Sequence, residues 1–167
     1  MDVTLKVNGR EQTWEAAPGE VLIDTLRRHG YFGVKRGCET GDCGACAVVL
    51  AGRSVNSCVT FTGSAARREV LTVEGLASPE GLHPIQQAFL DCGAVQCGFC
   101  TPGMILLAKV LIEENPSPRE EDVRKALGGV LCRCTGYRKP VEAILVAAER
   151  MRQGSNGVSE EAGRKGG

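Results

Sequence analysis

Cysteine content constrains this chain more than any other feature of its sequence. The nine cysteines are Cys38, Cys43, Cys46, Cys58, Cys92, Cys97, Cys100, Cys132 and Cys134. Because nine is an odd number, they cannot all form disulfides within the chain. The N-terminal segment MDVTLKVNGR lacks the apolar stretch of a signal peptide, so we expect a cytoplasmic chain, where stable disulfides are rare. Thiolates that bind a metal or take part in catalysis are therefore the first hypothesis.

The rest of the composition excludes several classes of protein. Twenty basic and twenty acidic side chains cancel, so the chain lacks the positive charge of a nucleic-acid-binding protein. Aromatic residues make up 4% of the chain, which is too few for base-stacking surfaces. No apolar run approaches the ~20 residues of a transmembrane helix. The 43% hydrophobic content over 167 residues predicts one folded domain or two small ones.

The first cysteine group lies in the segment GCETGDCGAC. Cys38, Cys43 and Cys46 have the spacing C-x4-C-x2-C, and Cys58 follows eleven residues later. This is the spacing of plant-type ferredoxins, in which four cysteines hold a [2Fe-2S] cluster. The interspersed glycines allow tight turns and let backbone N–H groups approach the sulfur atoms. The alternative is structural zinc, which favours two separate pairs of ligands over three cysteines in one loop.

The second cysteine group consists of two pairs, in the segments QCGFCTPGM and LCRCTGY. Cys97 and Cys100 directly precede the expected start of a helix, whose positive end would face anionic sulfur. Cys132 and Cys134 are two residues apart, so an extended backbone directs both thiolates to one side. The two pairs together predict one site with four sulfur ligands. Zinc or a second iron–sulfur cluster would fit this site, and the first group favours the cluster.

The first half of the chain predicts short strands and one helix, which we assign to a domain at residues 1–78. Alternating apolar residues at 3–7, followed by Asn8-Gly9, predict a hairpin with a type I′ turn. A second hairpin is expected over 47–58, and a last strand over 69–73. The segment VLIDTLRRHG, with apolar residues on one face, predicts a helix that ends at Gly30.

The second half predicts four short helices, which we assign to a domain at residues 79–153. Pro84, Thr101-Pro102 and Pro140 are typical of helix starts, and Ser117 to Glu120 resemble a capping box. The expected helices span 84–92, 101–114, 118–128 and 140–152. The segment 154–167 is rich in Gly, Ser and Glu and predicts a disordered tail. The fold class is therefore α+β, with a small mixed sheet followed by a helical bundle.

The two cysteine segments together resemble the iron–sulfur subunit of the molybdenum hydroxylases, the xanthine dehydrogenase family. The resemblance covers roughly residues 3–152 and includes all eight ligand positions in the same order. It implies an N-terminal β-grasp ferredoxin domain and a C-terminal four-helix bundle, each with one [2Fe-2S] cluster. The family usually has Asn before the L-C-R-C segment, where this chain has Val130, which puts in doubt one polar contact near the second cluster.

The resemblance further implies an electron-transfer subunit with no substrate chemistry of its own. Electrons would pass through the two clusters between a molybdopterin centre, in the cytosine dinucleotide form, and FAD. These cofactors would lie on a large and a medium subunit, in a dimer of heterotrimers. Gln96 would hydrogen-bond the molybdopterin, with Cys134 beside it on the electron path. A stand-alone ferredoxin and a zinc-stabilised interaction module are the alternative functions.

Several other residues have an ordinary structural interpretation. Cys92 shares a helical face with apolar residues and is expected to pack in the core. His29 and His83 are expected to be caps or surface residues, because eight cysteines already suffice for two clusters. An oxidised cluster on four thiolates is a dianion, so nearby cations would stabilise it, or would instead form surface ion pairs. The cations that flank the ligands are Lys35, Arg36, Arg133, Arg138 and Lys139.

Overall fold

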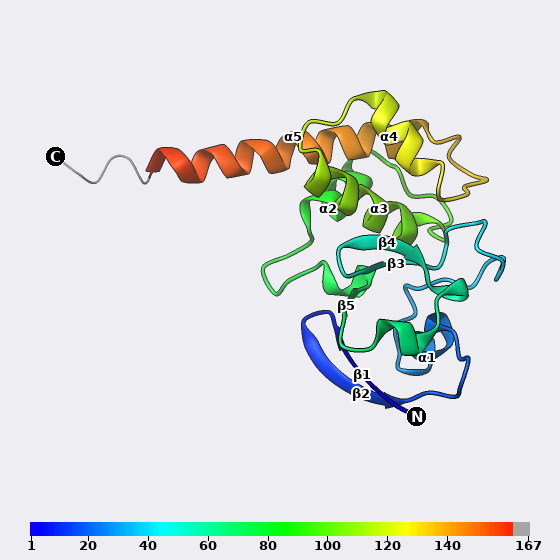
Figure 1. Cartoon of the computed structure of the whole chain (residues 1–167). Helices are drawn as coiled ribbons and strands as arrows, with labels where there is room; N and C mark the ends of the chain where they lie inside the picture. Colours follow the sequence, from blue (N-terminus) through cyan, green and yellow to red (C-terminus); the bar gives the residue numbers. More distant parts are fainter. Residues whose placement is uncertain (162–167) are drawn as a thin grey trace.

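The computed structural model describes residues 1–161, and the side chains of residues 1–154. A five-stranded sheet with one helix is followed along the chain by four further helices (Figure 1). The strands are β1 (Asp2–Val7), β2 (Arg10–Glu15), β3 (Ala47–Leu50), β4 (Arg53–Asn56) and β5 (Glu69–Leu71). The helices are α1 (Leu22–Arg28), α2 (Pro84–Asp91), α3 (Thr101–Glu114), α4 (Glu120–Leu127) and α5 (Arg138–Glu161). The expected α+β class is confirmed.

The sheet has the strand order β2-β1-β5-β3-β4, and only β1 and β5 run parallel. Both expected hairpins form. Asn8 and Gly9 have φ of 49° and 81°, and Ala51 and Gly52 have the same values. Positive φ at both central residues is the requirement of a type I′ turn. Strand β4 ends at Asn56, so Cys58 lies in the following 3-10 turn and not in the strand.

Both faces of the sheet are covered, which explains the uninterrupted apolar sequence of β3. Val48 and Leu50 belong to the core between the sheet and α1. Val49 points the other way and belongs to the core of the helical part, where α3 packs on β3. Because each face of β3 meets a helix, its four residues are all buried. The sequence predicted the helix on one face, but not the helical part on the other.

The four later helices form close to the predicted ranges, with differences at their ends. Pro84 is in the first turn of α2, and the Nδ1 atom of His83 accepts a hydrogen bond from the N–H of Ile85 at 3.3 Å, so His83 is a cap as expected. Helix α4 begins later than predicted. The expected Ser117–Glu120 capping box is wrong, because the carboxylate of Asp122 accepts from the Arg119 N–H at 2.9 Å instead.

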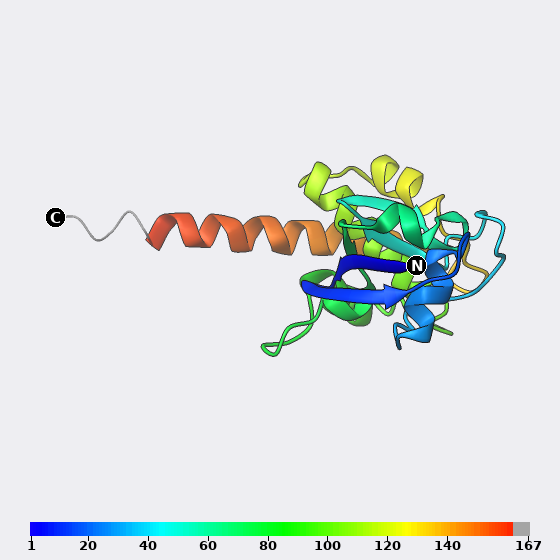
Figure 2. The same ribbon diagram turned by 60° about the horizontal axis from the view of Figure 1, so that its bottom comes forward.

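Helix α5 is longer than the sequence predicted. It begins at Arg138, continues to Glu161 and projects away from the body in both views (Figures 1 and 2). The expected helix end near residue 152 is therefore wrong. Of the segment 154–167, which the sequence predicted to be a disordered tail, residues up to Glu161 are helical, and residues 162–167 lie outside the described residues. Within the described residues, no helix has the length and apolar character needed to cross a membrane.

Glu20 connects the loop before α1 to the helix itself. Its carboxylate accepts hydrogen bonds from the Thr25 hydroxyl at 2.5 Å and from the Ala17 N–H at 3.0 Å, and it pairs with Arg28 at 2.8 Å. These contacts, the Thr25 hydroxyl first, lower the pKa of Glu20 to about 2. The charged form is thus favoured in the folded state, and α1 is held against the loop that precedes it.

The Glu20→Gln substitution is expected to lower the free energy of unfolding at neutral pH by about 1–2 kcal/mol. A carboxyl with a depressed pKa stabilises the fold above its unfolded pKa of about 4.3. That stabilisation is lost as pH falls towards 2, so the native and variant chains should converge at acidic pH. Urea unfolding at pH 7 and pH 3 measures both values. A difference that does not shrink at pH 3 would contradict this account.

Candidate metal centres

Three cysteines of the first group, Cys38, Cys43 and Cys46, lie on an irregular loop between α1 and β3. The N–H groups of Thr40 and Cys43 donate hydrogen bonds to the Sγ atom of Cys38, at 3.4 and 3.3 Å. Together with the Thr40 hydroxyl, which contributes most, they lower the pKa of Cys38 to about 6. Gly41 and Gly44 have φ of 89° and 66°, which glycine adopts without strain and which the loop needs to turn. The tight turns predicted for this loop are thus present at Gly41 and Gly44.

The remaining two cysteines of this group, Cys46 and Cys58, are buried next to each other. Cys46 is 2% exposed and Cys58 is 8% exposed, and their side chains are in contact. Burial, and then the neighbouring Cys46, raise the pKa of Cys58 to about 11. The Cys43 N–H donates to the Cys38 sulfur, and Cys46 neighbours Cys58, so the four cysteines are arranged as two neighbouring pairs.

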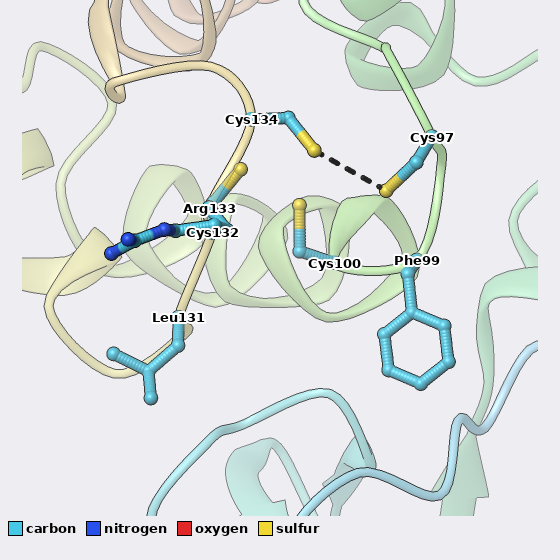
Figure 3. A pocket seen from close by; sticks show the side chains of 7 residues that line it. All are labelled: Cys97, Phe99, Cys100, Leu131, Cys132, Arg133 and Cys134. Atoms are coloured by element: carbon cyan, nitrogen blue, oxygen red, sulfur yellow. Dashed lines mark hydrogen bonds between the residues drawn. The ribbon is translucent and has the colours of Figure 1, made fainter.

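The second cysteine group surrounds a cavity of about 430 Å³ (Figure 3). Cys97 and Cys100 lie on the segment that leads into α3, and Cys132 and Cys134 on the segment between α4 and α5. Figure 3 shows the four sulfur atoms directed towards one another. The Sγ atoms of Cys97 and Cys134 are 3.6 Å apart, and Cys100 contacts Cys132. The structure thus brings together the two sequence segments that were assigned to one site. Each contact joins one cysteine from each segment.

The thiols of this cavity differ in how readily they ionise. Burial, and then the contact with Cys132, raise the pKa of Cys100 to about 12. Burial acts in the same direction on Cys132, but hydrogen bonds from the Thr135 hydroxyl and N–H outweigh it and lower the pKa of Cys132. Four thiolates at such short range are stable only around a cationic core. Metal binding supplies that core and releases the thiol protons.

The N-terminus of α3 points at the same cavity. Cys100 occupies the N-cap position, and the helix begins at Thr101 with Pro102 in its first turn. The prediction that Thr101 would be the N-cap is therefore wrong by one residue. The consequence is favourable for anion binding, because a cysteine sulfur now sits at the positive end of the helix.

Tyr137 is a positioning residue that the sequence analysis did not single out. Its hydroxyl accepts a hydrogen bond from the Cys132 N–H at 2.8 Å and donates one to the Val130 carbonyl at 3.1 Å. Its φ of 65° is rare for a bulky side chain, so surrounding contacts must hold it there. The available signal was its position three residues after Cys134, in the quoted segment LCRCTGY.

The Tyr137→Phe substitution is expected to loosen the Cys132 loop. It leaves one N–H and one carbonyl without their partner, which costs about 1–3 kcal/mol. The expected result is faster loss of iron to a chelator and a lower thermal midpoint. Tyr31→Phe is the matched control, because within the described residues the Tyr31 hydroxyl makes no hydrogen bond. Equal rates of iron loss in the two variants would contradict the proposed clamp.

The other predicted residues near the second group lie as follows. Gln96 is exposed beside Cys97, and within the described part of the chain its side chain makes no hydrogen bond. Cys92 is half-buried at the C-cap of α2 and packs against the helical core, as expected of a small hydrophobe. Val130 is fully buried in that core, so apolar packing occupies the position where the family usually has Asn.

The flanking cations divide into two kinds. Arg36 pairs with Asp24 and Glu39, and Lys139 pairs with Glu142, so both are neutralised at the surface. The other three cations form no ion pair within the described residues, and the Arg133 side chain lines the cavity but extends away from the four sulfur atoms (Figure 3). These are Lys35, Arg133 and Arg138. His29 is at the C-cap of α1 and stacks on Trp14, with ring centroids 4.1 Å apart.

Comparisons with known proteins match both halves of the chain to iron–sulfur domains. Residues 5–73 match the 2Fe-2S iron-sulfur cluster binding domain, and residues 72–145 match the [2Fe-2S] binding domain. The chain is 44% identical to the nicotinate dehydrogenase small FeS subunit of Eubacterium barkeri, over 89% of this chain and 95% of that subunit. It is 41% identical to the xanthine dehydrogenase iron-sulfur-binding subunit of Escherichia coli O157:H7, over 83% and 89% of the two chains.

A solved structure agrees with these relatives. The aldehyde oxidoreductase of Desulfovibrio desulfuricans superposes with a TM-score of 0.87 at 43% identity, over 91% of this chain. This chain spans only 17% of that much longer polypeptide. The matches are thus of two kinds: some are separate small subunits, and in one the matching region is part of a longer chain. From the identity, the coverage and the two domain matches, we conclude that this chain belongs to the family of small iron–sulfur subunits of the molybdenum hydroxylases.

Proposed function

We propose that the chain relays electrons through two [2Fe-2S] clusters between a molybdopterin centre and FAD on partner subunits. One observation carries this proposal: eight cysteines form two groups of four, and in the second group four sulfur atoms from two segments face one cavity, with the Sγ atoms of Cys97 and Cys134 3.6 Å apart. A [2Fe-2S] core has two iron atoms with two cysteines on each, so two pairs are the arrangement it requires. When bound, each cluster accepts and donates single electrons, and the protein holds and tunes it.

The contacts suggest which cysteines would share an iron atom. In the first group Cys38 would share one with Cys43, and Cys46 with Cys58. In the second group Cys97 would share one with Cys134, and Cys100 with Cys132.

The chain would have two functional parts, one for each cysteine group. Residues 1–78 would form a β-grasp ferredoxin domain, and residues 79–153 a helical domain that holds the second cluster. Backbone N–H groups that face sulfur, such as those of Thr40, Cys43 and Thr135, would stabilise the negative charge of the clusters. These donors would favour the reduced state of each cluster and so raise its reduction potential.

The surface around the second group supports an obligate partner. Cys97 and Cys134 are exposed, and next to them Phe99 and Leu131 are 46% and 61% exposed. Apolar side chains beside a redox centre would be covered in the assembled complex. We assign this surface to a large molybdopterin-binding subunit, with the cofactor in the cytosine dinucleotide form. There Gln96 would donate to the pterin, with Cys134 beside it.

The first group would face a medium FAD-binding subunit. Val59, which adjoins Gly41 of the cysteine loop, is 54% exposed, and nearby in sequence Phe61 is 59% exposed. The complete assembly would be a dimer of heterotrimers in the cytoplasm. A stand-alone ferredoxin is the alternative function, and it requires no partner on either surface.

Metal and sulfide analysis tests the proposal directly. The purified chain is expected to contain about four iron and four acid-labile sulfide per polypeptide. It should be brown and should bleach with dithionite. Zinc in place of iron, or only about two iron per chain, would refute the two-cluster function. Flavin and molybdenum should co-purify from the native source, whereas a fully iron-loaded monomer would favour the stand-alone ferredoxin.

A further inference from the structure

Three glycines meet where the two cysteine groups approach each other. Gly44 lies in the first cysteine loop, Gly103 is in the first turn of α3 after Cys100, and Gly129 precedes the Cys132 loop. A Cβ atom on Gly44 would overlap the carbonyl oxygen of Gly129. A Cβ atom on Gly103 would lie 2.6 Å from the carbonyl oxygen of Gly44. We call this contact of Gly44, Gly103 and Gly129 the glycine junction.

The contact with Gly44 accounts for the presence of glycine at position 103. Glycine within a helix costs about 1 kcal/mol relative to alanine, and the φ of Gly103 is not one that requires glycine. The feature that excludes a side chain is the backbone of the other domain. The close approach also allows the Leu131 N–H to donate a hydrogen bond to the Cys43 carbonyl at 2.9 Å. Cys43 belongs to the first group, and Leu131 adjoins Cys132 of the second.

We propose that the glycine junction fixes the separation of the two clusters and thereby sets the rate of electron transfer between them. The proposal rests on the function inferred above. Electron tunnelling slows exponentially with distance, so a small displacement of the two loops has a large effect. Because the atoms in contact are backbone atoms, no side-chain rotation can relieve an added methyl group. The two loops would have to move apart.

The test measures the magnetic interaction of the two clusters in the dithionite-reduced, iron-loaded complex. Two nearby reduced clusters split each other's paramagnetic resonance signals, and the dipolar part of this splitting falls with the inverse cube of their distance. Gly103→Ala and Gly44→Ala are expected to reduce the splitting and to slow flavin reduction after mixing with substrate. Iron and sulfide counts establish that both clusters are present in each variant.

Matched controls separate the junction from general effects of alanine. Gly154→Ala also replaces a helical glycine, and Gly93, with φ of 63°, matches Gly44 at 66°. A Cβ atom at either control position meets nothing within 4 Å, so both should keep the native splitting. If Gly44→Ala fails to take up iron, Gly103→Ala decides the question. It changes no residue of either cysteine loop, and alanine is a better helix former than glycine.

The outcomes of this experiment distinguish the two levels of inference. Native splitting and native rates in a fully loaded Gly103→Ala variant would overturn the role of the junction and leave the proposed function intact. A native complex without two reducible clusters would overturn the proposed function itself. Reduced splitting in both junction variants, with native splitting in both controls, supports the proposal.

Discussion

Replacement of Cys100 by alanine is expected to halve the iron content, from about four to about two per chain. Cys100 is buried at the N-cap of α3 and contacts Cys132, so no other thiol can take its place. The second cluster would be lost, while the first group, on separate elements, would keep its four thiols. Because the second group lies on the proposed molybdenum side, substrate should then reduce neither the first cluster nor the flavin.

Cys92→Ala is the matched control for this experiment. Cys92 is half-buried in the same helical part and packs against the same core, but it belongs to neither group. The control should therefore contain all its iron and transfer electrons at the native rate. Metal analysis, paramagnetic resonance and stopped-flow absorbance on the assembled complexes give the three readouts. Full iron content in Cys100→Ala would show that this cysteine is not a ligand.

The division into a strand-rich and a helix-rich half could be predicted because each depends on local signals. Asn8-Gly9 fixes the first hairpin, and Pro84 and Pro102 mark the first turns of α2 and α3. The spacing of Cys38, Cys43 and Cys46 is another local signal, whereas joining the pair at Cys97 to the pair at Cys132, across α3 and α4, was a further inference. These signals operate within a few residues of the chain, which is why a single sequence contains them.

The contacts between the two halves could not be predicted, because they depend on packing between distant segments. Nothing near Gly103 in the sequence indicates that the backbone of Gly44 will lie against it. The apolar sequence of β3 was compatible with burial on two faces, but it did not identify α3 as the second cover. Tyr137 reaches backwards to Cys132 and Val130 only because the loop folds over on itself.

Replacement of Cys43 by alanine is expected to interrupt the relay at its other end. The first cluster should be lost, and the iron content should again fall to about two per chain. The contact with the second domain should survive, because Cys43 accepts the Leu131 hydrogen bond through its main-chain carbonyl, which alanine retains. Substrate should therefore still reduce the second cluster in a single turnover, whereas flavin reduction should slow by orders of magnitude.

This variant and Cys100→Ala are informative as a pair, because both lose one cluster and differ in which step fails. Paramagnetic resonance after a single mixing with substrate shows whether the remaining cluster is reduced, and flavin absorbance gives the later step. The order of the relay requires a reduced cluster in Cys43→Ala and an oxidised one in Cys100→Ala. Native flavin reduction in Cys43→Ala would mean that electrons bypass the first group. A remaining second cluster that substrate cannot reduce would mean that the second group does not adjoin the molybdenum centre.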